Sequence, residues 1–358
     1  MPEILPSWTF FPDFTSGNPY QACLAETLAL HGWAVRPGDI AAATLAARSG
    51  QAIFHLHWEQ PAYFAGADET EAFALAESFL RALDAFRAAG GVLVWTLHNA
   101  APHEERYPAV NAAMQRGLAR RADLVHVHNY AGATHAVILG VPEASILLVR
   151  HPSYADTYPD DITDDAARRY LGLRGEDLVF TFFGAMRGYK GLPRLMRAFD
   201  LAHAALPDTR LVLAGRCPEP GAARVLAPTP ALRLLTRQIA DAEVQYVMRA
   251  ADCVVLPYEA ILTSGTLALA QGFGRPVIVP DLPSMEEEVT DGVNGFLYVA
   301  GSDGALAAAL WRAADNVRAL RGHMRAASRA TVAGRDFATL AAALSTAVAG
   351  AQPTQRAA

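Results

Sequence analysis

Short apolar runs rich in β-branched residues alternate along the chain with longer segments of helical periodicity. Continuous apolar runs of this kind are typical of parallel strands that are buried on both faces. In the first half of the chain the pattern predicts strands at residues 8–11, 51–58, 91–98, 123–128 and 145–150. Segments such as 69–90 and 109–122 have the spacing of amphipathic helices, so we expect helices between these strands.

A polar segment with Pro and an acidic cluster, residues 151–172, predicts a linker followed by a short helix. We interpret its Asp pairs as solvated helix-capping residues in preference to metal ligands. The alternation of strand and helix then restarts. The second half has predicted strands at 177–184, 210–215, 252–258, 275–280 and 295–299.

Two consecutive runs of alternation predict an α/β protein with two doubly wound, Rossmann-like domains, each with a mostly parallel sheet. We place these domains at residues 1–165 and 166–335, followed by a C-terminal helix and a flexible tail over 336–358. Ligands of such sheets bind beyond the carboxyl ends of the strands. We therefore expect the site in a central cleft between the two domains.

Composition agrees with this architecture and excludes several functions. The chain has 358 residues, of which 52% are hydrophobic, and its net charge is −6, which does not indicate a nucleic-acid-binding protein. Its cysteines have no paired spacing, so neither disulfides nor a zinc site are expected. We see no secretory leader and no apolar run long enough to span a membrane. A cytoplasmic protein is expected, with membrane association on the cytoplasmic face left open.

The stretch "FFGAMRGYKGLPRLMRAF", residues 182–199, carries the first candidate chemistry. Gly184 ends a predicted strand and lets a ligand approach the backbone. Arg187 and Lys190 follow just before a predicted helix, whose first N–H groups are unpaired and carry partial positive charge. Together these features predict a site for a phosphate or diphosphate, with a pair of solvated cations as the alternative.

A second stretch of the same kind begins at residue 257 and contains "TSGT", residues 263–266. Ser264 and Thr266 can cap the following helix, and Gly265 permits a close approach of a ligand. An ordinary capped helix is the alternative. Because the same half of the chain contains two such stretches, we expect them to form one diphosphate site.

In this order, "FFGAMRGYKGLPRLMRAF", "LALAQGFGRPVIVP" and "EEEVTDGVNGFLY" resemble motifs of the GT-B glycosyltransferases, in particular those like family 4. The resemblance covers residues 178–320 well and the first half more loosely. It implies the GT-B fold and use of a nucleotide sugar. It also implies that Lys190 contacts the donor diphosphate and that Glu287 or Glu288 lies in a loop near the donor.

The chain departs from the family pattern at several positions. The family has an Arg directly after the first Gly, where this chain has Ala185, and Arg187 lies two places later. Two carboxylates that the family places around the second stretch are replaced by Ile261 and Leu269. Retention of anomeric configuration usually accompanies those carboxylates, so we favour inversion.

The first half supplies further candidates. His98 ends a predicted strand, and the resemblance implies that it faces the donor sugar. Gly17 and Asn18 lie where such enzymes carry a glycine-rich loop between donor phosphate and acceptor. Inversion needs a general base, for which Asp13, Glu104 and His103 are the alternatives. The pairs His55/His57 and His126/His128 each share a strand face but lack a Cys partner, so we expect no metal.

The resemblance to bacterial exopolysaccharide mannosyltransferases implies transfer of a hexose from a nucleoside diphosphate sugar, with GDP-mannose favoured, to a hydroxyl of a lipid-linked saccharide. No metal or other cofactor is expected, because Arg187 and Lys190 would neutralise the leaving diphosphate. Peripheral membrane contact through residues 116–122 is an alternative to a plain amphipathic helix, which we prefer. A sugar-nucleotide epimerase or hydrolase, or a non-catalytic binding subunit, stays open.

Overall fold

The computed structural model describes residues 5–101, 106–217 and 229–351. The chain divides into unit 1, Met1–His151 with Arg335–Ala358, and unit 2, Pro152–Gly334. The sequence placed the boundary at 165/166 and set the C-terminal segment apart. In the structure the linker and its helix belong to unit 2, and the C-terminal helix belongs to unit 1. The end of the expected flexible tail lies outside the described residues.

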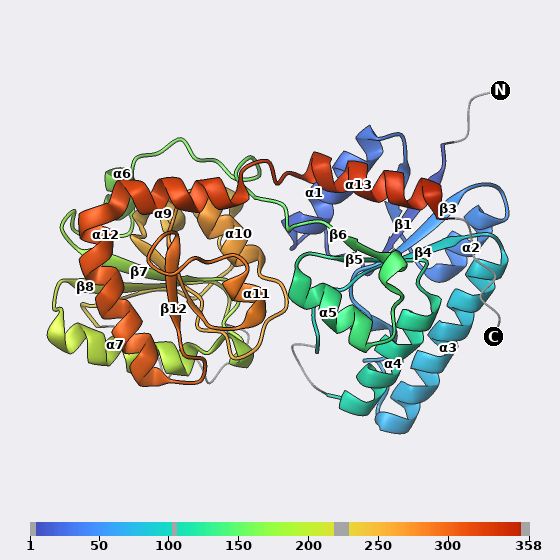
Figure 1. Cartoon of the computed structure of the whole chain (residues 1–358), viewed down its shortest axis with the longest axis horizontal. Coiled ribbons are helices and arrows are strands. Elements are labelled where there is room, and N and C mark those ends of the chain that lie inside the picture. The colour runs from blue at the N-terminus through green and yellow to red at the C-terminus, as the bar shows by residue number, and fades with distance from the viewer. Residues whose placement is uncertain (1–4, 102–105, 218–228, 352–358) are drawn as a thin grey trace. The chain divides into compact units, whose positions relative to one another are not determined.

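Unit 1 is built on a six-stranded sheet in which every pairing is parallel, with the order β2-β1-β3-β4-β5-β6 (Figure 1). Its strands are β1 (Ser7–Phe11), β2 (Ala34–Pro37), β3 (Ala52–Leu56), β4 (Val92–Thr96), β5 (Leu124–Val127) and β6 (Ile146–Leu148). β2 was not predicted. It is an edge strand whose residues are mostly exposed, so it lacks the apolar run that marks a buried strand.

Helices cover both faces of this sheet (Figure 1). α1 (Pro19–Leu30) packs against α13 (Phe337–Gly350), and Trp33 just after α1 donates a hydrogen bond to Ser345 of α13 at 3.0 Å. The neighbours α2 (Ile40–Ala47), α3 (Glu69–Ala88) and α4 (Pro108–Arg121) cover the other face, and α5 (Tyr130–Ile138) contacts β5 and β6. The C-terminal helix therefore completes the layer that α1 begins.

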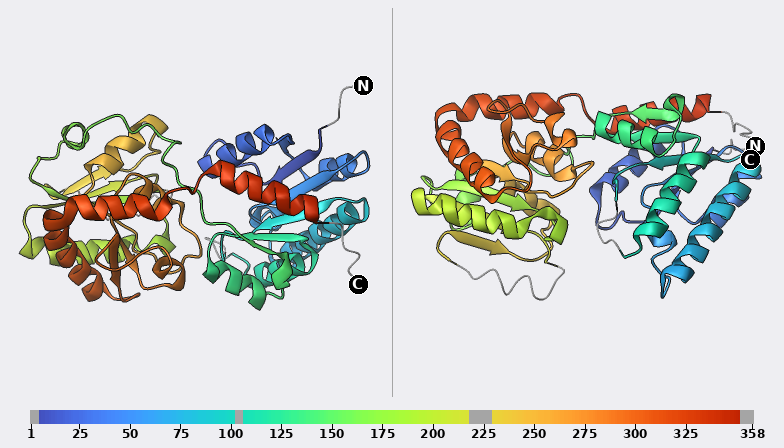
Figure 2. Two further views of the ribbon diagram at one scale, coloured as in Figure 1. Left: turned by 45° about the horizontal axis from the view of Figure 1, so that its top comes forward. Right: turned by 60° about the horizontal axis from the view of Figure 1, so that its bottom comes forward.

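Unit 2 repeats this plan with the strand order β12-β11-β10-β7-β8-β9, again with parallel pairings throughout (Figure 2). Its strands are β7 (Leu178–Phe183), β8 (Thr209–Ala214), β9 (Leu232–Leu235), β10 (Cys253–Val255), β11 (Val277–Pro280) and β12 (Gly295–Tyr298). The unpredicted β9 lies at the edge of the sheet, like β2. The prediction of two doubly wound parallel sheets is confirmed.

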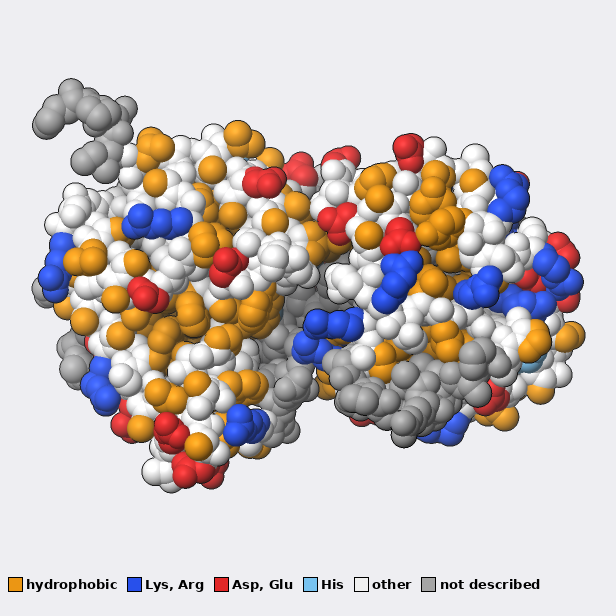
Figure 3. Space-filling view, turned by 180° about the vertical axis from the view of Figure 1, so that it is seen from behind, with side chains coloured by type: hydrophobic (Ala, Val, Ile, Leu, Met, Phe, Trp, Pro, Cys, Tyr) orange, Lys and Arg blue, Asp and Glu red, His pale blue; other side chains and the backbone are white. Residues whose placement is uncertain are grey.

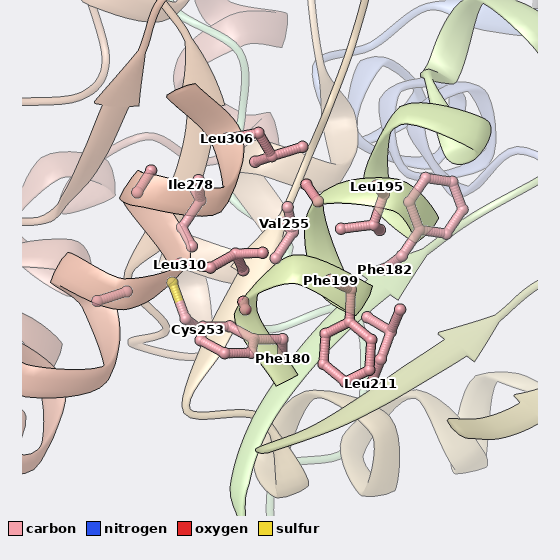
Figure 4. Packing of buried hydrophobic residues seen from close by; sticks show 14 of the residues in the cluster. Phe180, Phe182, Leu195, Phe199, Leu211, Cys253, Val255, Ile278, Leu306 and Leu310 are labelled. Atoms are coloured by element: carbon pink, nitrogen blue, oxygen red, sulfur yellow. The ribbon is translucent and has the colours of Figure 1, made fainter. Parts of the chain in front are cut away.

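The helices of unit 2 are α6 (Asp164–Tyr170), α7 (Leu192–Ala205), α9 (Asp241–Ala250), α10 (Gly265–Gly272), α11 (Pro283–Glu286) and α12 (Asp303–Val332). α7 packs against α12, and α6 packs against α9. Figure 4 shows the core between the sheet and the α7–α12 layer. Alternate residues of β7, Phe180 and Phe182, point into this core, and burial of each such side chain contributes about 1.5–3 kcal/mol.

The predicted linker is less solvated than its composition indicates. Thr163 caps α6 by accepting a hydrogen bond from the N–H of Ala166. Asp164 in the first turn instead binds the guanidinium of Arg275, which is fully buried, at 2.6 Å, and Arg325 at 2.6 Å. The acidic cluster thus supplies the partner of a buried cation.

Residues 116–122 form the end of α4, where Leu118 and Ala119 are buried and Arg121 pairs with Asp84 at 2.7 Å. Leu118, the one large apolar side chain of this segment, is therefore not exposed. No helix within the described residues is long and apolar enough to cross a membrane. Cationic and anionic side chains are interspersed on the face shown in Figure 3.

Candidate functional site

The carboxyl end of β7 brings Gly184 against the side chain of Lys190. A β-carbon built on Gly184 would lie 2.7 Å from Lys190 Nζ and 3.7 Å from Thr266 Oγ1. The backbone of Gly184 has φ of +111°, a conformation that side-chain-bearing residues rarely adopt. The structure therefore gathers residues from both predicted anion-binding stretches around one glycine.

A second glycine makes this approach possible. Gly191 has φ of +66° and leads from a short 3₁₀ turn, Gly188–Lys190, into α7. A β-carbon on Gly191 would lie 1.9 Å from the carbonyl oxygen of Pro257, which lies two residues beyond the end of β10. Close packing of the 188–191 turn on the end of β10 holds Lys190 beside the N-terminus of α10.

No carboxylate of the described residues forms an ion pair with Lys190 or Arg187. The nearby Glu259 pairs with Arg194 instead, at 3.7 Å. Lys190 Nζ lies 6.0 Å from the ring centroids of both Phe182 and Tyr258. Burial, together with the charge of Arg187, lowers the pKa of Lys190 to about 8. This is a cationic site whose charge no described carboxylate compensates, as an anion-binding site requires.

The N-terminus of α10 supplies hydrogen-bond donors to the same place. Ser264 caps the helix by accepting from the N–H of Leu267 at 3.2 Å, as predicted. The hydroxyl of the buried Tyr258 lies 3.1 Å from Ser264 Oγ. The unpaired N–H groups of the first turn, at Gly265 and Thr266, add the partial positive charge of a helix N-terminus. Tyr258 was not among the predicted residues.

The two positions at which the family carboxylates are replaced are at least partly buried. Leu269 is buried in α10, and Ile261 is half-buried in the loop before it. Glu287 directly follows α11, whose Ser284 donates a hydrogen bond to the carbonyl of Ile261 at 2.7 Å. The segment that carries Glu287 is thereby tied to the loop that leads into α10.

In unit 1, His98 lies just beyond β4 and is held from several sides. Its ring stacks on Trp58 at 4.5 Å with an interplanar angle of 15°. Its Nε2 lies 3.1 Å from Nδ1 of His57, and the ring of Tyr20 meets it edge-on at 5.2 Å. His98 is therefore placed by neighbouring strands at the carboxyl edge of the sheet, as the sequence indicated.

A buried hydrogen-bond chain crosses the same sheet. The Trp8 indole N–H donates to His55 Nδ1 at 3.3 Å, His55 Nε2 lies 2.7 Å from Thr96 Oγ1, and Thr96 Oγ1 lies 3.1 Å from His126 Nδ1. His126 Nε2 reaches the carbonyl of Val149 at 3.3 Å. An indole N–H can only donate and a carbonyl can only accept, so the direction of every bond is fixed and both imidazoles are neutral Nε2–H tautomers.

Burial is the main reason why these histidines stay neutral. It lowers the pKa of His55 and His57 well below 6.5, with neighbouring histidines adding to the effect, and lowers the pKa of His126 to about 4. No group of described residues has the arrangement of a metal site. His55 and His126, one from each pair, belong to the hydrogen-bond chain between the strands, whereas His57 contacts His98.

The remaining predicted residues lie in the loop after β1. Asp13 is exposed, and its Oδ1 accepts hydrogen bonds from the N–H and hydroxyl of Thr15 at 3.1 and 2.7 Å. Gly17 has no neighbour within 4 Å of a built β-carbon, and Asn18 caps α1. His103 and Glu104 lie outside the described residues.

Two features escaped the sequence prediction. Glu59, beside Trp58, is buried; burial raises its pKa, although the N–H group of Glu59 itself and Gln115 Nε2, 3.0 Å from Oε1, donate hydrogen bonds to it. Its position next to an apolar strand gave no signal of this. The second feature was visible in the sequence: Lys190 is the only lysine among 30 basic residues. Because all the others are Arg, the single Lys distinguishes this position in the sequence.

Residues 177–316 match the family model described as "Glycosyl transferases group 1". The D-inositol 3-phosphate glycosyltransferase of Mycobacterium sp. (strain JLS) is 30% identical over 209 residues, which cover 55% of this chain and 45% of that protein. The chain thus spans about half the length of this relative. The GDP-mannose:glycolipid 4-β-D-mannosyltransferase of Xanthomonas campestris is 28% identical over 284 residues, covering 75% and 72%.

Solved structures show the same architecture over nearly the whole chain. HepE of Anabaena in complex with UDP has a TM-score of 0.72 at 17% identity, covering 97% of this chain and 100% of that one. Sucrose-phosphate synthase of Thermosynechococcus elongatus has a TM-score of 0.70 at 17% identity, covering 97% and 99%. At this identity the likeness shows the fold, two doubly wound domains of the GT-B type.

Proposed function

We propose that the chain is a group 1 glycosyl transferase that transfers a hexose from a nucleoside diphosphate sugar to a hydroxyl, because residues 177–316 match that family model and the fold is of the GT-B type. The observation that carries this proposal is the uncompensated cationic site. Lys190 and Arg187 lie without an anionic partner among the described residues, and Gly184 brings Lys190 near Thr266 in the first turn of α10. A diphosphate would supply the missing negative charge.

The same groups have a role in the reaction. Negative charge grows on the diphosphate as its bond to the sugar breaks, and fixed donors that stabilise this charge lower the barrier. Lys190 Nζ, the Ser264 hydroxyl and the N–H groups of Gly265 and Thr266 are the donors, and no metal is needed. Asp13 is our candidate for the base that takes the acceptor proton, with inversion at the anomeric carbon.

We favour GDP-mannose as the donor and a lipid-linked saccharide as the acceptor. The similarity to the Xanthomonas GDP-mannose:glycolipid mannosyltransferase supports both choices, because that match extends over both units. We also propose a role in exopolysaccharide synthesis at the cytoplasmic face of a membrane. The HepE structure with UDP-glucose keeps a uridine donor as the alternative.

A thermal-shift panel of GDP, UDP and dTDP with their hexose derivatives tests the proposal. A ligand present at 100 times its Kd stabilises the protein by about 2.7 kcal/mol, so a true donor raises Tm by several degrees. Absence of a shift with every nucleotide would overturn the proposal. A shift with UDP sugars alone would replace the mannose donor and leave the glycosyl transfer standing.

Product analysis without an acceptor separates the alternatives. A transferase leaves the sugar nucleotide largely intact until a saccharide acceptor is added. Release of free hexose would indicate a hydrolase, and a changed sugar configuration an epimerase. Nucleotide binding without turnover on any saccharide-lipid would indicate a binding subunit, a result that the apolar Ile261 and Leu269 would then explain.

A further inference from the structure

Two aromatic side chains contact each other in the open at the carboxyl edge of the sheet of unit 1. Phe14 follows β1 and Trp58 follows the adjacent β3. Their ring centroids lie 5.4 Å apart at an angle of 46°, so the rings form a corner. Phe14 is 43% exposed, and Trp58 is half-buried. Ligands of doubly wound sheets bind at this edge.

The loop that carries Phe14 is held in place. Gln21, a buried residue of α1, accepts a hydrogen bond from the N–H of Phe14 at 2.8 Å through Oε1. Its Nε2 donates to the carbonyl of Pro12, also at 2.8 Å. One buried amide therefore fixes the backbone on both sides of Asp13. A large apolar ring is exposed here on a fixed support and not on a floppy loop.

Trp58 is fixed from its other side. Its ring lies parallel to the imidazole of His98 at 4.5 Å, and His98 is itself hydrogen-bonded to His57. The aromatic surface is thus layered, with buried His98 beneath Trp58 and Phe14 beside it. Preorganised aromatic rings lose little conformational entropy when a ligand stacks on them.

A carboxylate neighbours this surface in the chain. The exposed carboxylate of Asp13 lies next to Phe14 in the chain, oriented by its two hydrogen bonds from Thr15. A ligand that fits must have an apolar face for the rings and hydroxyl groups at its rim for the carboxylate. A pyranose ring has this construction, with axial C–H groups on one face and hydroxyls around the edge.

We propose that Phe14 and Trp58 form a platform on which a pyranose ring of the acceptor saccharide stacks. The inference rests on the proposed function, because it assigns the acceptor to a saccharide and places it on unit 1. A lipid chain is the competing occupant of an exposed apolar surface, and a single probe distinguishes the two. Octyl β-D-glucopyranoside, used below its critical micelle concentration, carries both a pyranose ring and an alkyl chain.

Saturation-transfer NMR measures which part of this probe contacts the protein. We expect the strongest transfer to the ring protons of one sugar face, and a decrease of about threefold or more in Phe14→Ala, with the signal kept in Phe14→Trp. Leu45→Ala, which removes a side chain that is 66% exposed on α2, is the matched control and should leave the spectrum unchanged. Phe14 is exposed, so its replacement should not prevent folding.

Strongest transfer to the alkyl chain would overturn the inference in favour of a lipid-binding surface. So would an unchanged spectrum in Phe14→Ala, or the absence of transfer in the parent protein. The nucleotide-induced rise in Tm is measured on the same samples. If the nucleotide shift persists while the sugar contact is missing, the platform is wrong and the donor site stands. If the nucleotide shift is missing as well, the proposed function fails with it.

Discussion

The ammonium group of Lys190 lies against Gly184, so close that a β-carbon on Gly184 would approach Nζ to 2.7 Å. The glycine at the end of β7 therefore makes the space in which the cation resides. Because Gly184 also has φ of +111°, any other residue would strain the backbone and displace the cation at once.

We therefore expect Gly184→Ala to weaken nucleotide binding by about tenfold or more, the loss of one charge-assisted hydrogen bond, and to lower stability by on the order of 1 kcal/mol or more. Calorimetric titration and denaturant unfolding measure these effects. Gly188→Ala is the matched control, because Gly188 is exposed in the same loop and has no neighbour within 4 Å of a built β-carbon. Equal effects of the two substitutions would contradict this account of Gly184.

The pH dependence of nucleotide binding should report the titration of Lys190. Its pKa of about 8 in the unliganded protein means that it is charged at pH 7 and largely neutral at pH 9.5. A diphosphate binds the charged form, so affinity should fall by up to about thirtyfold across this range. In Lys190→Met the affinity at pH 7 should be about 10–100-fold lower and free of this transition, so that the two proteins bind about equally at pH 9.5. A transition that survives in Lys190→Met would assign it to another group.

The hydroxyl of Thr96 links His55 to His126 in the buried hydrogen-bond chain. Thr96→Val keeps the shape but leaves two buried imidazole nitrogens unpaired, which should cost roughly 2–4 kcal/mol of unfolding free energy. Thr9→Val is the matched control: Thr9 is buried in β1 of the same sheet, but its hydroxyl has no hydrogen-bond partner among the described residues. We expect that substitution to be neutral or stabilising, and a similar cost at both sites would exclude the chain as a source of stability.

We expect acid to destabilise unit 1, because its buried histidines resist protonation in the folded protein. The pKa of His126 is lowered from 6.5 to about 4, so the unfolded chain takes up a proton below pH 6.5 while the folded protein does not. Stability is therefore complete above pH 6.5 and is lost as pH falls from 6.5 towards 4, by on the order of 3 kcal/mol for this residue alone. Unfolding curves at pH 7.5, 6 and 5 measure the slope. A flat profile would mean that the buried imidazoles are protonated in the folded protein.

Asp164 holds the buried guanidinium of Arg275. Burial alone would raise the pKa of Asp164, but the hydrogen bonds and charges of Arg275 and Arg325 outweigh it and lower the pKa to about 2. Asp164→Asn leaves a buried cation without its counter-charge and should cost on the order of 3–5 kcal/mol at neutral pH. Asp165→Asn, exposed in the same helical turn, should cost no more than about 0.5 kcal/mol. Comparable losses would show that Asp164 acts only at the helix N-terminus.

Periodicity predicted both parallel sheets because buried parallel strands are continuous apolar runs. It missed β2 and β9, which are four-residue edge strands each interrupted by an Arg. The cationic site was also predictable, because one strand–turn–helix segment contains Gly184, Arg187 and Lys190. Only six positions separate Tyr258 from Ser264, but the contact between their hydroxyls was not predicted. The sequence does not specify which way the side chain of a Tyr after a strand points.

The sequence by itself determined the two doubly wound units and the single lysine beside a strand-end glycine, because local periodicity and local turn chemistry specify them. The tertiary structure decided the rest. Trp8, His55, Thr96 and His126 come from four strands, and strand order alone makes them neighbours in one hydrogen-bond chain. Phe14 and Trp58 likewise meet because β1 pairs with β3 as well as with β2, the next strand in sequence. Contacts between strands depend on which strands lie side by side, and that is a property of packing the whole sheet, which no single segment carries.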